Sequence, residues 1–474
     1  MKCVWCIVTI FAIIVCVCAC GQQPTSSQPT SSLNSTSTSL PVNTSTNETK
    51  ETMNMMETTS SITSDVFGTQ TSSQTKNTII SLTTTKAVVR NTTKTSSKLV
   101  ATPPKENFVT DLGITQAMIN ESVYSKGNQA RLAAVMKKAR SGQPITIGFL
   151  GGSITDGSNV PIEKSYARLV KAWWEATFPL SRITYVNAGI GSTGSIIGVH
   201  RVDADLLSKK PDFVVLEYAV NDGTDTETRN AYESLVRRIL KSPNNPALML
   251  LFMCTNGGGS AQDSHAIVGK HYDLPMISYK DGISTAVREN RFPWTKFSDD
   301  TVHPNIFGYA VCGAFIKSYL NSVVTQLDTI SLAEKPLPKA LSGDFYQNTH
   351  ILGSNNYTPK ALGDFQKTNN ALYFWKNGWE VKRGANRPIV FEVQARRVWL
   401  LYKRDITNTK GIASVSVDGA HFCDLNGHFQ DGWGEIGGLQ LVAKADTPQK
   451  YTISIQMKAG QNKDFVLAAV YVAE

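Results

Sequence analysis

The chain has 474 residues, of which 41% are hydrophobic and 18% are charged, and its formal net charge is +9. This length suits two or three domains, and the composition is that of a globular protein rather than a polytopic membrane protein. The basic residues form no run of five or six and no recognised nucleic-acid motif, so we expect no nucleic-acid partner and only a mild preference for acidic polysaccharide.

The first 20 residues carry one Lys and then an almost unbroken apolar run. This is the layout of a secretory signal, and its length is close to the lower limit of about 17 residues for a bilayer span. Residues 1–20 are therefore predicted to be a signal peptide or an uncleaved signal-anchor. A lipoprotein leader with Cys20 as the lipidated residue is a third interpretation. All three predict a secreted or cell-surface protein that meets a membrane only through this segment, if it is uncleaved.

Residues 21–105 are predicted to be a disordered stalk. Between residues 21 and 100, 37 of 80 residues are Ser or Thr, and such a segment buries too little apolar surface to offset its chain entropy. Glycosylation and an unmodified flexible linker are both open interpretations. The Asn-x-Ser/Thr acceptor triplets begin at Asn34, Asn43, Asn47, Asn91, Asn120 and Asn356.

Five of the eight cysteines lie in the first 20 residues, which leaves Cys254, Cys312 and Cys423 for the rest of the chain. Three cysteines do not make a disulfide framework. Cys254 and Cys312 have apolar neighbours in the sequence and are expected to be small buried hydrophobes. No HExxH motif occurs, and we expect neither a metal site nor an organic cofactor.

Residues 110–328 alternate between helical patterns and short apolar runs. Apolar strands without alternation, separated by helices, indicate a parallel sheet that is covered on both faces. The predicted fold is therefore a three-layer α/β/α domain with a flavodoxin-like sheet. In chain order, the predicted elements are a helix over 128–140, a strand over 145–150, a helix over 166–178, strands over 183–188 and 213–219, a helix over 227–240, a strand over 247–253, a helix over 262–272, a strand over 275–278 and two further helices.

Residues 338–474 contain short β-rich runs that are separated by turn signals. This spacing predicts an accessory β-sandwich. Its tryptophans either fill the core or include a platform on which a sugar stacks. They are Trp375, Trp379, Trp399 and Trp433.

Polar segments follow the predicted strands of the α/β domain. They lie at 151–157, 187–194 and 217–222, and a fourth lies at 299–305. Ligands of open parallel sheets bind beyond the carboxyl ends of the strands, so we expect these four segments to meet at one edge.

In order and spacing, the four segments resemble the four sequence blocks of the SGNH (GDSL-like) hydrolases, over roughly residues 143–325. The resemblance implies that Ser153 is the nucleophile, that the loop at Ser192 and the side chain of Asn221 belong to the oxyanion hole, and that Asp300 and His303 form the last block. There are two departures. Gly152 stands where the GDS signature has Asp, which resembles the GGSIT branch, and Ser192 replaces the usual Gly beside Gly191.

The chemistry of these residue types agrees with the resemblance. A serine hydroxyl needs an adjacent base, which His303 supplies, while Asp300 orients the imidazole. The Ser153 N–H, the N–H of Gly191 or Ser192 and the Asn221 amide would bind the oxyanion. Taken singly, each segment also fits a turn or a helix cap, and Glu217 and Asp222 fit ion-pair or capping roles. Surface or structural positions are expected for the remaining histidines, which are His200, His265, His271, His350, His421 and His428.

The sequence thus predicts a serine carboxylester hydrolase that forms a Ser153 acyl-enzyme. The resemblance extends to esterases with an accessory β-sandwich, which favours an O-acetylated extracellular polysaccharide as substrate. Two alternatives stay open: a lipase or lysophospholipase, and a glycan-binding surface protein without activity.

Overall fold

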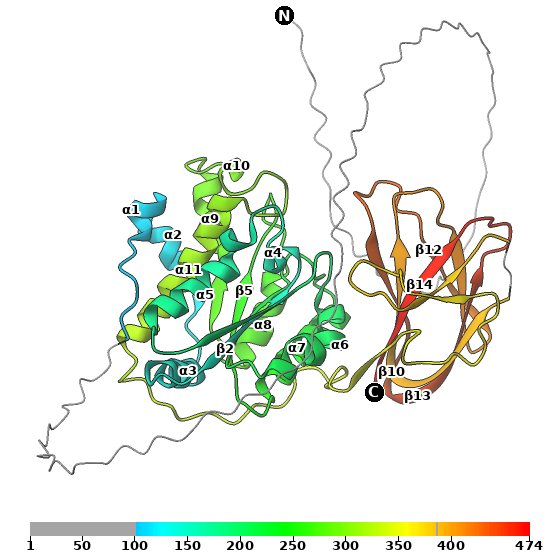
Figure 1. Cartoon of the computed structure of the whole chain (residues 1–474), viewed down its shortest axis with the longest axis horizontal. Coiled ribbons are helices and arrows are strands. Elements are labelled where there is room, and N and C mark those ends of the chain that lie inside the picture. Colours follow the sequence, from blue (N-terminus) through cyan, green and yellow to red (C-terminus); the bar gives the residue numbers. More distant parts are fainter. Residues whose placement is uncertain (1–100, 385–386) are drawn as a thin grey trace, which may run out of the picture. The chain divides into compact units, whose positions relative to one another are not determined.

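A computed structural model describes residues 101–384 and 387–474 (Figure 1). The expected leader at residues 1–20 and the stalk up to residue 100 lie outside the described residues. In the part of the chain that is described, no helix combines the length and the apolar composition that are needed to cross a bilayer.

The first part of the fold is a six-stranded sheet with the order β1-β6-β5-β4-β2-β3. Strands β2 to β6 are parallel to their neighbours, and β1 pairs antiparallel with β6 at the edge. Strands β3 to β6 have the flavodoxin-like order. In this order the chain adds strands first on one side of β2 and then on the other, so the switch point lies between β2 and β4. The strands are β1 (Val123–Ser125), β2 (Ile145–Gly151), β3 (Ile183–Gly189), β4 (Phe213–Glu217), β5 (Ala247–Phe252) and β6 (Met276–Ser278).

Helices cover both faces of this sheet, which confirms the three-layer fold. One buried cluster joins α1, α2, α3, α5, α9 and α11 to one face, and a second joins α6, α7 and α8 to the other. The helices are α1 (Phe108–Leu112), α2 (Gln116–Glu121), α3 (Ala130–Arg140), α4 (Ser153–Asp156), α5 (Tyr166–Thr177), α6 (Ser195–Asp205), α7 (Thr226–Leu240), α8 (Gln262–His271), α9 (Tyr279–Arg288), α10 (Trp294–Phe297) and α11 (Ile306–Thr325), with 3-10 turns η1 (Ile162–Lys164) and η2 (Leu207–Lys209).

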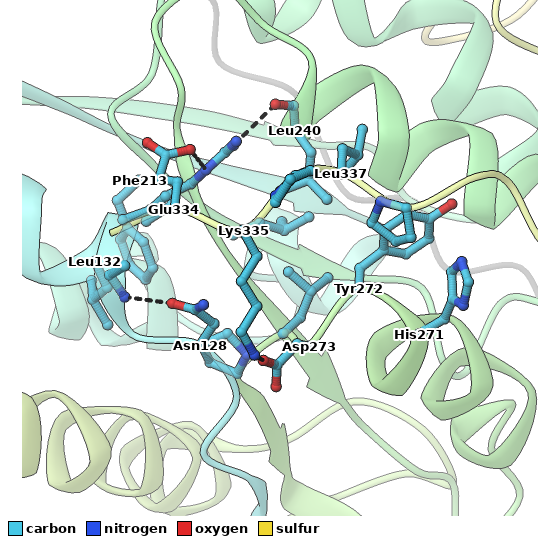
Figure 2. A pocket seen from close by; sticks show the side chains of 18 residues that line it. Asn128, Leu132, Phe213, Leu240, His271, Tyr272, Asp273, Glu334, Lys335 and Leu337 are labelled. Carbon is cyan, nitrogen blue, oxygen red and sulfur yellow. Dashed lines mark hydrogen bonds and ion pairs between the residues drawn. The ribbon is translucent and has the colours of Figure 1, made fainter. Parts of the chain in front are cut away.

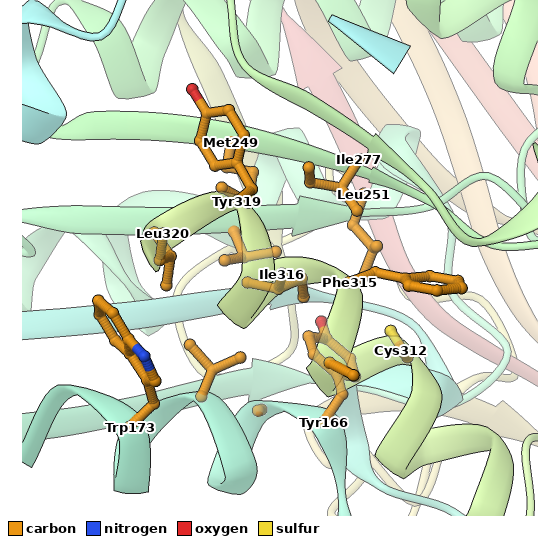
Figure 3. Close-up of a cluster of buried hydrophobic side chains, with 14 of the residues drawn as sticks. Tyr166, Trp173, Met249, Leu251, Ile277, Cys312, Phe315, Ile316, Tyr319 and Leu320 are labelled. Atoms are coloured by element: carbon orange, nitrogen blue, oxygen red, sulfur yellow. The ribbon is translucent and has the colours of Figure 1, made fainter. Parts of the chain in front are cut away.

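The long helix α11 forms much of the first cluster, as Figure 3 shows. Phe315, Ile316 and Leu320 are fully buried with Met249 of β5. Each such side chain contributes about 1.5–3 kcal/mol when it is fully buried. Cys312 lies in the same cluster, where burial raises the pKa of its thiol. The expectation that Cys254 and Cys312 are small buried side chains is confirmed.

The second part is an antiparallel eight-stranded sheet with the order β12-β11-β13-β10-β14-β9-β8, and β7 pairs with β14. The expectation of short, separate strands is wrong at two places, because β10 runs for 16 residues and β13 for 22. The strands are β7 (Thr349–Leu352), β8 (Gln366–Thr368), β9 (Gly378–Val381), β10 (Ile389–Arg404), β11 (Ile412–Val417), β12 (Ala420–Asn426), β13 (Ile436–Met457) and β14 (Phe465–Ala473).

Irregular pairing makes the long strands compatible with the expected sandwich. The register between β10 and β13 shifts between Ala395 and Arg397, and again between Val398 and Trp399. Such bulges bend a strand, so its two halves can enter two layers. Phe391 on one side of the shifts and Leu400 on the other are both fully buried in one shared core.

Candidate active site

The expected nucleophile begins a very short helix. Strand β2 ends at Gly151, the chain turns at Gly152, and Ser153 is the first residue of α4. The helix packs closely against the end of β3, where a Cβ on Gly189 would lie 2.2 Å from the Asp156 nitrogen. Ser153 therefore lies at the carboxyl ends of β2 and β3 and is only 8% exposed.

Asp300 and His303 lie on the loop between α10 and α11, and the fold brings them to Ser153. His303 Nε2 lies 2.9 Å from Ser153 Oγ, and His303 Nδ1 lies 2.8 Å from Asp300 Oδ2. An ionised carboxylate can only accept, so His303 Nδ1 donates to Asp300 and Nε2 accepts from the Ser153 hydroxyl. The three side chains form one hydrogen-bonded relay, as their positions after the strands led us to expect.

The Asp300 carboxylate is held in its ionised form. Although burial opposes it, hydrogen bonds from the backbone N–H groups of Val302 and His303 and from the His303 ring lower the pKa of Asp300. Those N–H groups donate to Oδ1 over 2.7 Å and 2.6 Å, and Asn159 Nδ2 donates to Oδ2 over 2.9 Å. Asp300 is therefore an acceptor that is fixed in place for the His303 ring.

Donors for an oxyanion gather beside Ser153. The N–H groups of Ser153, Gly191 and Ser192 donate to no acceptor among the residues that the structure describes. Gly191 is adjacent, since a Cβ built on it would lie 3.6 Å from Ser153 Cβ. The Asn221 side chain approaches from the end of β4 and lies against Gly152. Both Gly191 and Ser192 remain candidates for the loop donor.

A buried carboxyl lies beneath α4. Glu217, the last residue of β4, is fully buried and accepts a hydrogen bond from Thr155 Oγ1 over 3.1 Å. Burial raises the pKa of Glu217 to about 7. Because Thr155 is part of α4, Glu217 supports the helix that begins with Ser153.

Asp222 has the capping role that was considered for it, and it also contacts a histidine ring. Asp222 Oδ2 lies 3.0 Å from His265 Nε2, and Oδ1 accepts from the Ser195 N–H over 2.7 Å at the start of α6. His265 is buried and stacks on Tyr232 with a centroid distance of 3.6 Å. The structural role expected for His265 is thus the one found.

Three further side chains at the site carry no motif, and the sequence did not single them out. Asn159 donates to Asp300, and Arg201 on α6 donates to the carbonyl oxygen of Gly151 over 3.1 Å. The Tyr373 hydroxyl, from the loop between β8 and β9, donates to the carbonyl oxygen of Gly191. For Tyr373 the sequence held one indirect signal, which is Ser192. A residue other than glycine in an oxyanion loop needs support from outside the loop.

The four tryptophans of the β-sheet part divide between core and surface. Trp379 and Trp399 are buried, whereas Trp433 is 65% exposed. Trp375 is half-buried, and its Nε1 donates to the Asn377 carbonyl oxygen over 3.0 Å. Trp433 packs edge-on against Phe429 and is the tryptophan of this set that is open to a ligand.

A cavity of about 320 Å³ lies elsewhere on the α/β domain (Figure 2). Its lining includes Phe213 and Ala247, the first residues of β4 and β5. The cavity therefore lies at the amino ends of the strands, whereas Ser153 lies at their carboxyl ends. Its charged residues already pair with one another, as in the Lys335–Asp273 contact of 2.8 Å. Across the described ranges, no three His, Cys, Asp or Glu side chains are grouped as a metal ion requires.

Comparison with known proteins agrees with this geometry. Residues 149–311 match the GDSL-like lipase/acylhydrolase family, and this range contains the relay and the oxyanion donors. The α/β domain belongs to this family. A crystal structure of a two-domain esterase active on acetylated mannans matches both parts of the fold, with a TM-score of 0.71 and 29% identity over 75% of this chain and 98% of that one. This GDSL-like protein is a carboxylic ester hydrolase.

Two further matches bear on substrates. The two-domain mannan esterase has also been crystallised with mannopentaose, and that structure matches with a TM-score of 0.70 and 29% identity over 76% of this chain and 99% of that one. Thioesterase 1/protease 1/lysophospholipase L1 of Escherichia coli K12 is 25% identical over 182 residues, which is 37% of this GDSL-like chain and 82% of the relative. The first match extends over both parts of the fold, and the second over about one domain.

Proposed function

We propose that this esterase removes O-acetyl groups from extracellular polysaccharide through an acetyl-enzyme on Ser153. The unbroken relay from Asp300 through His303 to Ser153, with contacts of 2.8 Å and 2.9 Å, carries the proposal. A hydroxyl at this distance from an imidazole nitrogen can pass its proton to that nitrogen as it attacks an ester.

The steps follow from the atoms in place. Ser153 Oγ attacks the acetyl carbonyl carbon while its proton passes to His303 Nε2, and Asp300 stabilises the imidazolium. The carbonyl oxygen becomes an oxyanion beside the N–H groups of Ser153, Gly191 or Ser192 and the Asn221 side chain. His303 then protonates the departing sugar oxygen. Water, activated by His303, cleaves the acetyl-enzyme, so that acetate leaves and Ser153 regains its proton.

Architecture favours a glycan over a lipid as substrate. The relative active on acetylated mannans shares both the α/β domain and the β-sheet part with this chain. The exposed Trp433 and the half-exposed Tyr373 provide aromatic surface on which a sugar ring can stack. The printed name of the Escherichia coli relative supports lysophospholipase activity as a second candidate.

The proposed location is outside the cell, on a stalk. This rests on the apolar run at residues 1–20, the Ser/Thr-rich residues 21–105 and the acceptor triplets. With it we propose the domain limits 110–328 for the esterase and 338–474 for the β-sandwich. Fractionation of cells that express a C-terminally tagged chain tests the location, and a band that shifts after deglycosylation tests the stalk. Recovery of the tag in the cytosol contradicts the proposal.

Ser153→Ala tests the mechanism. The variant should lose turnover of p-nitrophenyl acetate and of acetylated manno-oligosaccharides, measured as released p-nitrophenol and acetate, while its unfolding free energy changes by no more than about 1 kcal/mol. Asn221→Ala keeps the nucleophile and base, so its rate should fall by about 100- to 1,000-fold. Activity that survives Ser153→Ala unchanged would falsify the assignment.

Substrate preference separates the two candidate functions. A series of p-nitrophenyl esters from two to twelve acyl carbons, assayed beside acetylated manno-oligosaccharide and lysophospholipid, reports acyl and alcohol preference in one set of kcat/KM values. The glycan proposal expects the acetyl ester and the acetylated sugar to give the highest values. A maximum at long acyl chains, with lysophospholipid turned over and acetylated sugar untouched, supports the lipid alternative.

A further inference from the structure

The loop between β8 and β9 reaches the expected oxyanion loop of the α/β domain. Tyr373, on that loop, donates its hydroxyl proton to the carbonyl oxygen of Gly191. Gly191 is the residue whose added Cβ would meet both the Tyr373 hydroxyl oxygen, at 3.3 Å, and Ser153 Cβ, at 3.6 Å. Tyr373 and Ser153 therefore both approach Gly191, the first with its hydroxyl and the second with its Cβ.

The peptide bond after Gly191 contains a backbone donor, the N–H of Ser192. The Gly191 carbonyl and the Ser192 N–H belong to one planar trans unit, in which the C=O and the N–H point in opposite directions. A hydrogen bond that fixes the carbonyl therefore fixes the direction of the N–H. In the described part of the chain, the Ser192 N–H has no acceptor of its own.

The peptide needs such support because of its conformation. Ser192 has a φ of 55°, in the left-handed region that a residue with a side chain rarely adopts. Such a residue costs about 1–3 kcal/mol and persists only when its surroundings hold it. The Thr193 hydroxyl closes the turn on one side by donating to the Ile190 carbonyl oxygen over 2.7 Å. Tyr373 supplies the contact at the Gly191 carbonyl.

Tyr373 is itself held firmly. Its backbone N–H donates to Glu435 Oε1 over 2.7 Å, and Glu435 forms a 2.5 Å ion pair with Lys403, whose side chain is 9% exposed. Burial raises the pKa of the Tyr373 hydroxyl to about 12. The hydroxyl therefore stays protonated, as a donor must, through neutral and moderately alkaline pH.

We propose that Tyr373 is a positioning residue, which aligns the Gly191–Ser192 peptide so that the Ser192 N–H serves as an oxyanion donor. The β-sheet part thereby completes the catalytic centre of the α/β domain. The inference rests on the proposed acyl-enzyme at Ser153, and it selects Ser192 over Gly191 as the loop donor.

Tyr373→Phe tests it, with p-nitrophenyl acetate as a substrate too small to need a polysaccharide subsite. We expect kcat and kcat/KM to fall together by about 10-fold, less than the 100- to 1,000-fold that follows loss of a direct donor, with KM unchanged. Inhibition by phenylboronic acid, which forms a tetrahedral adduct with a reactive serine, should weaken by a similar factor. Tyr357→Phe is the matched control, because its hydroxyl also donates to a backbone carbonyl, that of Glu392, within the β-sheet part.

The outcomes are separable from those for the proposed function. If Ser153→Ala abolishes activity but Tyr373→Phe retains the wild-type kcat and boronate affinity, this inference is overturned and the esterase mechanism stands. A rise in KM alone overturns it as well, because it assigns Tyr373 to substrate contact. Should Tyr373→Phe fold poorly, Glu435→Gln keeps the hydroxyl but loosens its support, and an unchanged kcat there also counts against the inference.

Discussion

At the scale of single residues, the position before the nucleophile decides where Asn221 can lie. A Cβ on Gly152 would stand 2.2 Å from Asn221 Oδ1 and 3.4 Å from Nδ2. The backbone of Gly152, with φ −89° and ψ −150°, does not itself require glycine. The departure from the Asp of the GDS signature is therefore explained by space, because the Asn221 amide occupies the place of a side chain at residue 152.

Gly152→Ala should accordingly disable Asn221 without disturbing the fold. The added methyl group displaces the side-chain amide, so kcat for p-nitrophenyl acetate should fall toward the value for Asn221→Ala, about 100-fold or more below wild type. The double variant provides the control. Residues that act through one contact are not additive, so Gly152→Ala should cost little once residue 221 is Ala. If the double variant loses kcat by the product of the two single-variant factors, this explanation is contradicted.

The site residues differ in how well the sequence predicts them. Ser153, Asp300 and His303 are expected to meet because each follows a strand or lies in a recognisable block, and parallel strands bring their carboxyl ends to one edge. Tyr373 lies on a loop in another part of the chain, and its function depends on one hydroxyl at a backbone carbonyl. No spacing or residue type marks such a contact, so only the folded chain reveals it.

At the scale of elements, the end of β4 places a buried carboxyl against α4. Burial holds the pKa of Glu217 at about 7, above its usual 4.5, although hydrogen bonds from Thr155 and Gly152 oppose the shift. At a pH between these two pKa values, the carboxyl of Glu217 is ionised in the unfolded chain but still protonated in the folded chain. The contribution of Glu217 to stability is thus fully present below about pH 4.5 and is lost as the pH rises to about 7.

Glu217→Gln removes this titration while keeping the shape of the side chain. Wild type should lose about 3 kcal/mol of unfolding free energy through this group between pH 4.5 and 7.5, since one pKa unit corresponds to about 1.36 kcal/mol, and the variant should not. The difference in unfolding free energy, variant minus wild type, should therefore rise by that amount over this pH range. Urea unfolding of both proteins at several pH values measures the difference. Thr155→Val is a useful companion, because it removes the hydroxyl that donates to Glu217 but leaves the carboxyl to titrate. A difference between Gln and wild type that stays constant with pH disproves the assignment.

Several elements were not predictable from local patterns. Helix α6 is buried along most of its length, from Ser195 to Val202, and so it lacks the polar face that marks a helix in a sequence. Strand β1 has three residues, too few for a period to show. The turn signals inside β10 and β13 are bulges within continuous strands, which a sequence pattern cannot distinguish from chain reversals. The parallel strands were predictable, because their apolar runs are uninterrupted.

At the scale of the whole molecule, the α/β domain and the β-sheet part share one hydrophobic cluster. It includes Leu235 of α7 together with Trp399 of β10 and Tyr471 of β14. A buried ion pair crosses the same boundary, where Arg397 Nε lies 2.8 Å from Glu227 Oε2 with both side chains at most 11% exposed. If one part unfolded alone, the other would be left with an unpaired charge and with an exposed half of the cluster, and an unpaired buried charge is strongly destabilising. The two parts are therefore expected to unfold as one unit.

A buried histidine makes this boundary sensitive to acid. His200 on α6 stacks on Tyr471 of β14 with a centroid distance of 4.6 Å, and its Nδ1 lies 2.7 Å from the Ile196 carbonyl oxygen. Burial lowers the pKa of His200 from 6.5 to about 3, and the nearby charges of Arg238 and His350 act in the same direction. The folded protein therefore keeps the ring neutral where the unfolded chain would protonate it.

The stability that His200 contributes is fully present above about pH 6.5 and is lost as the pH falls toward 3, because only the unfolded chain takes up the proton in that window. By pH 5 the loss should be about 2 kcal/mol. His200→Phe keeps an aromatic ring against Tyr471 and does not titrate, so its unfolding free energy should decline less between pH 7.5 and 5 than that of wild type. His421→Phe, at an exposed position on β12, is the control and should follow wild type. Parallel pH profiles for wild type and His200→Phe would show that another group governs acid unfolding.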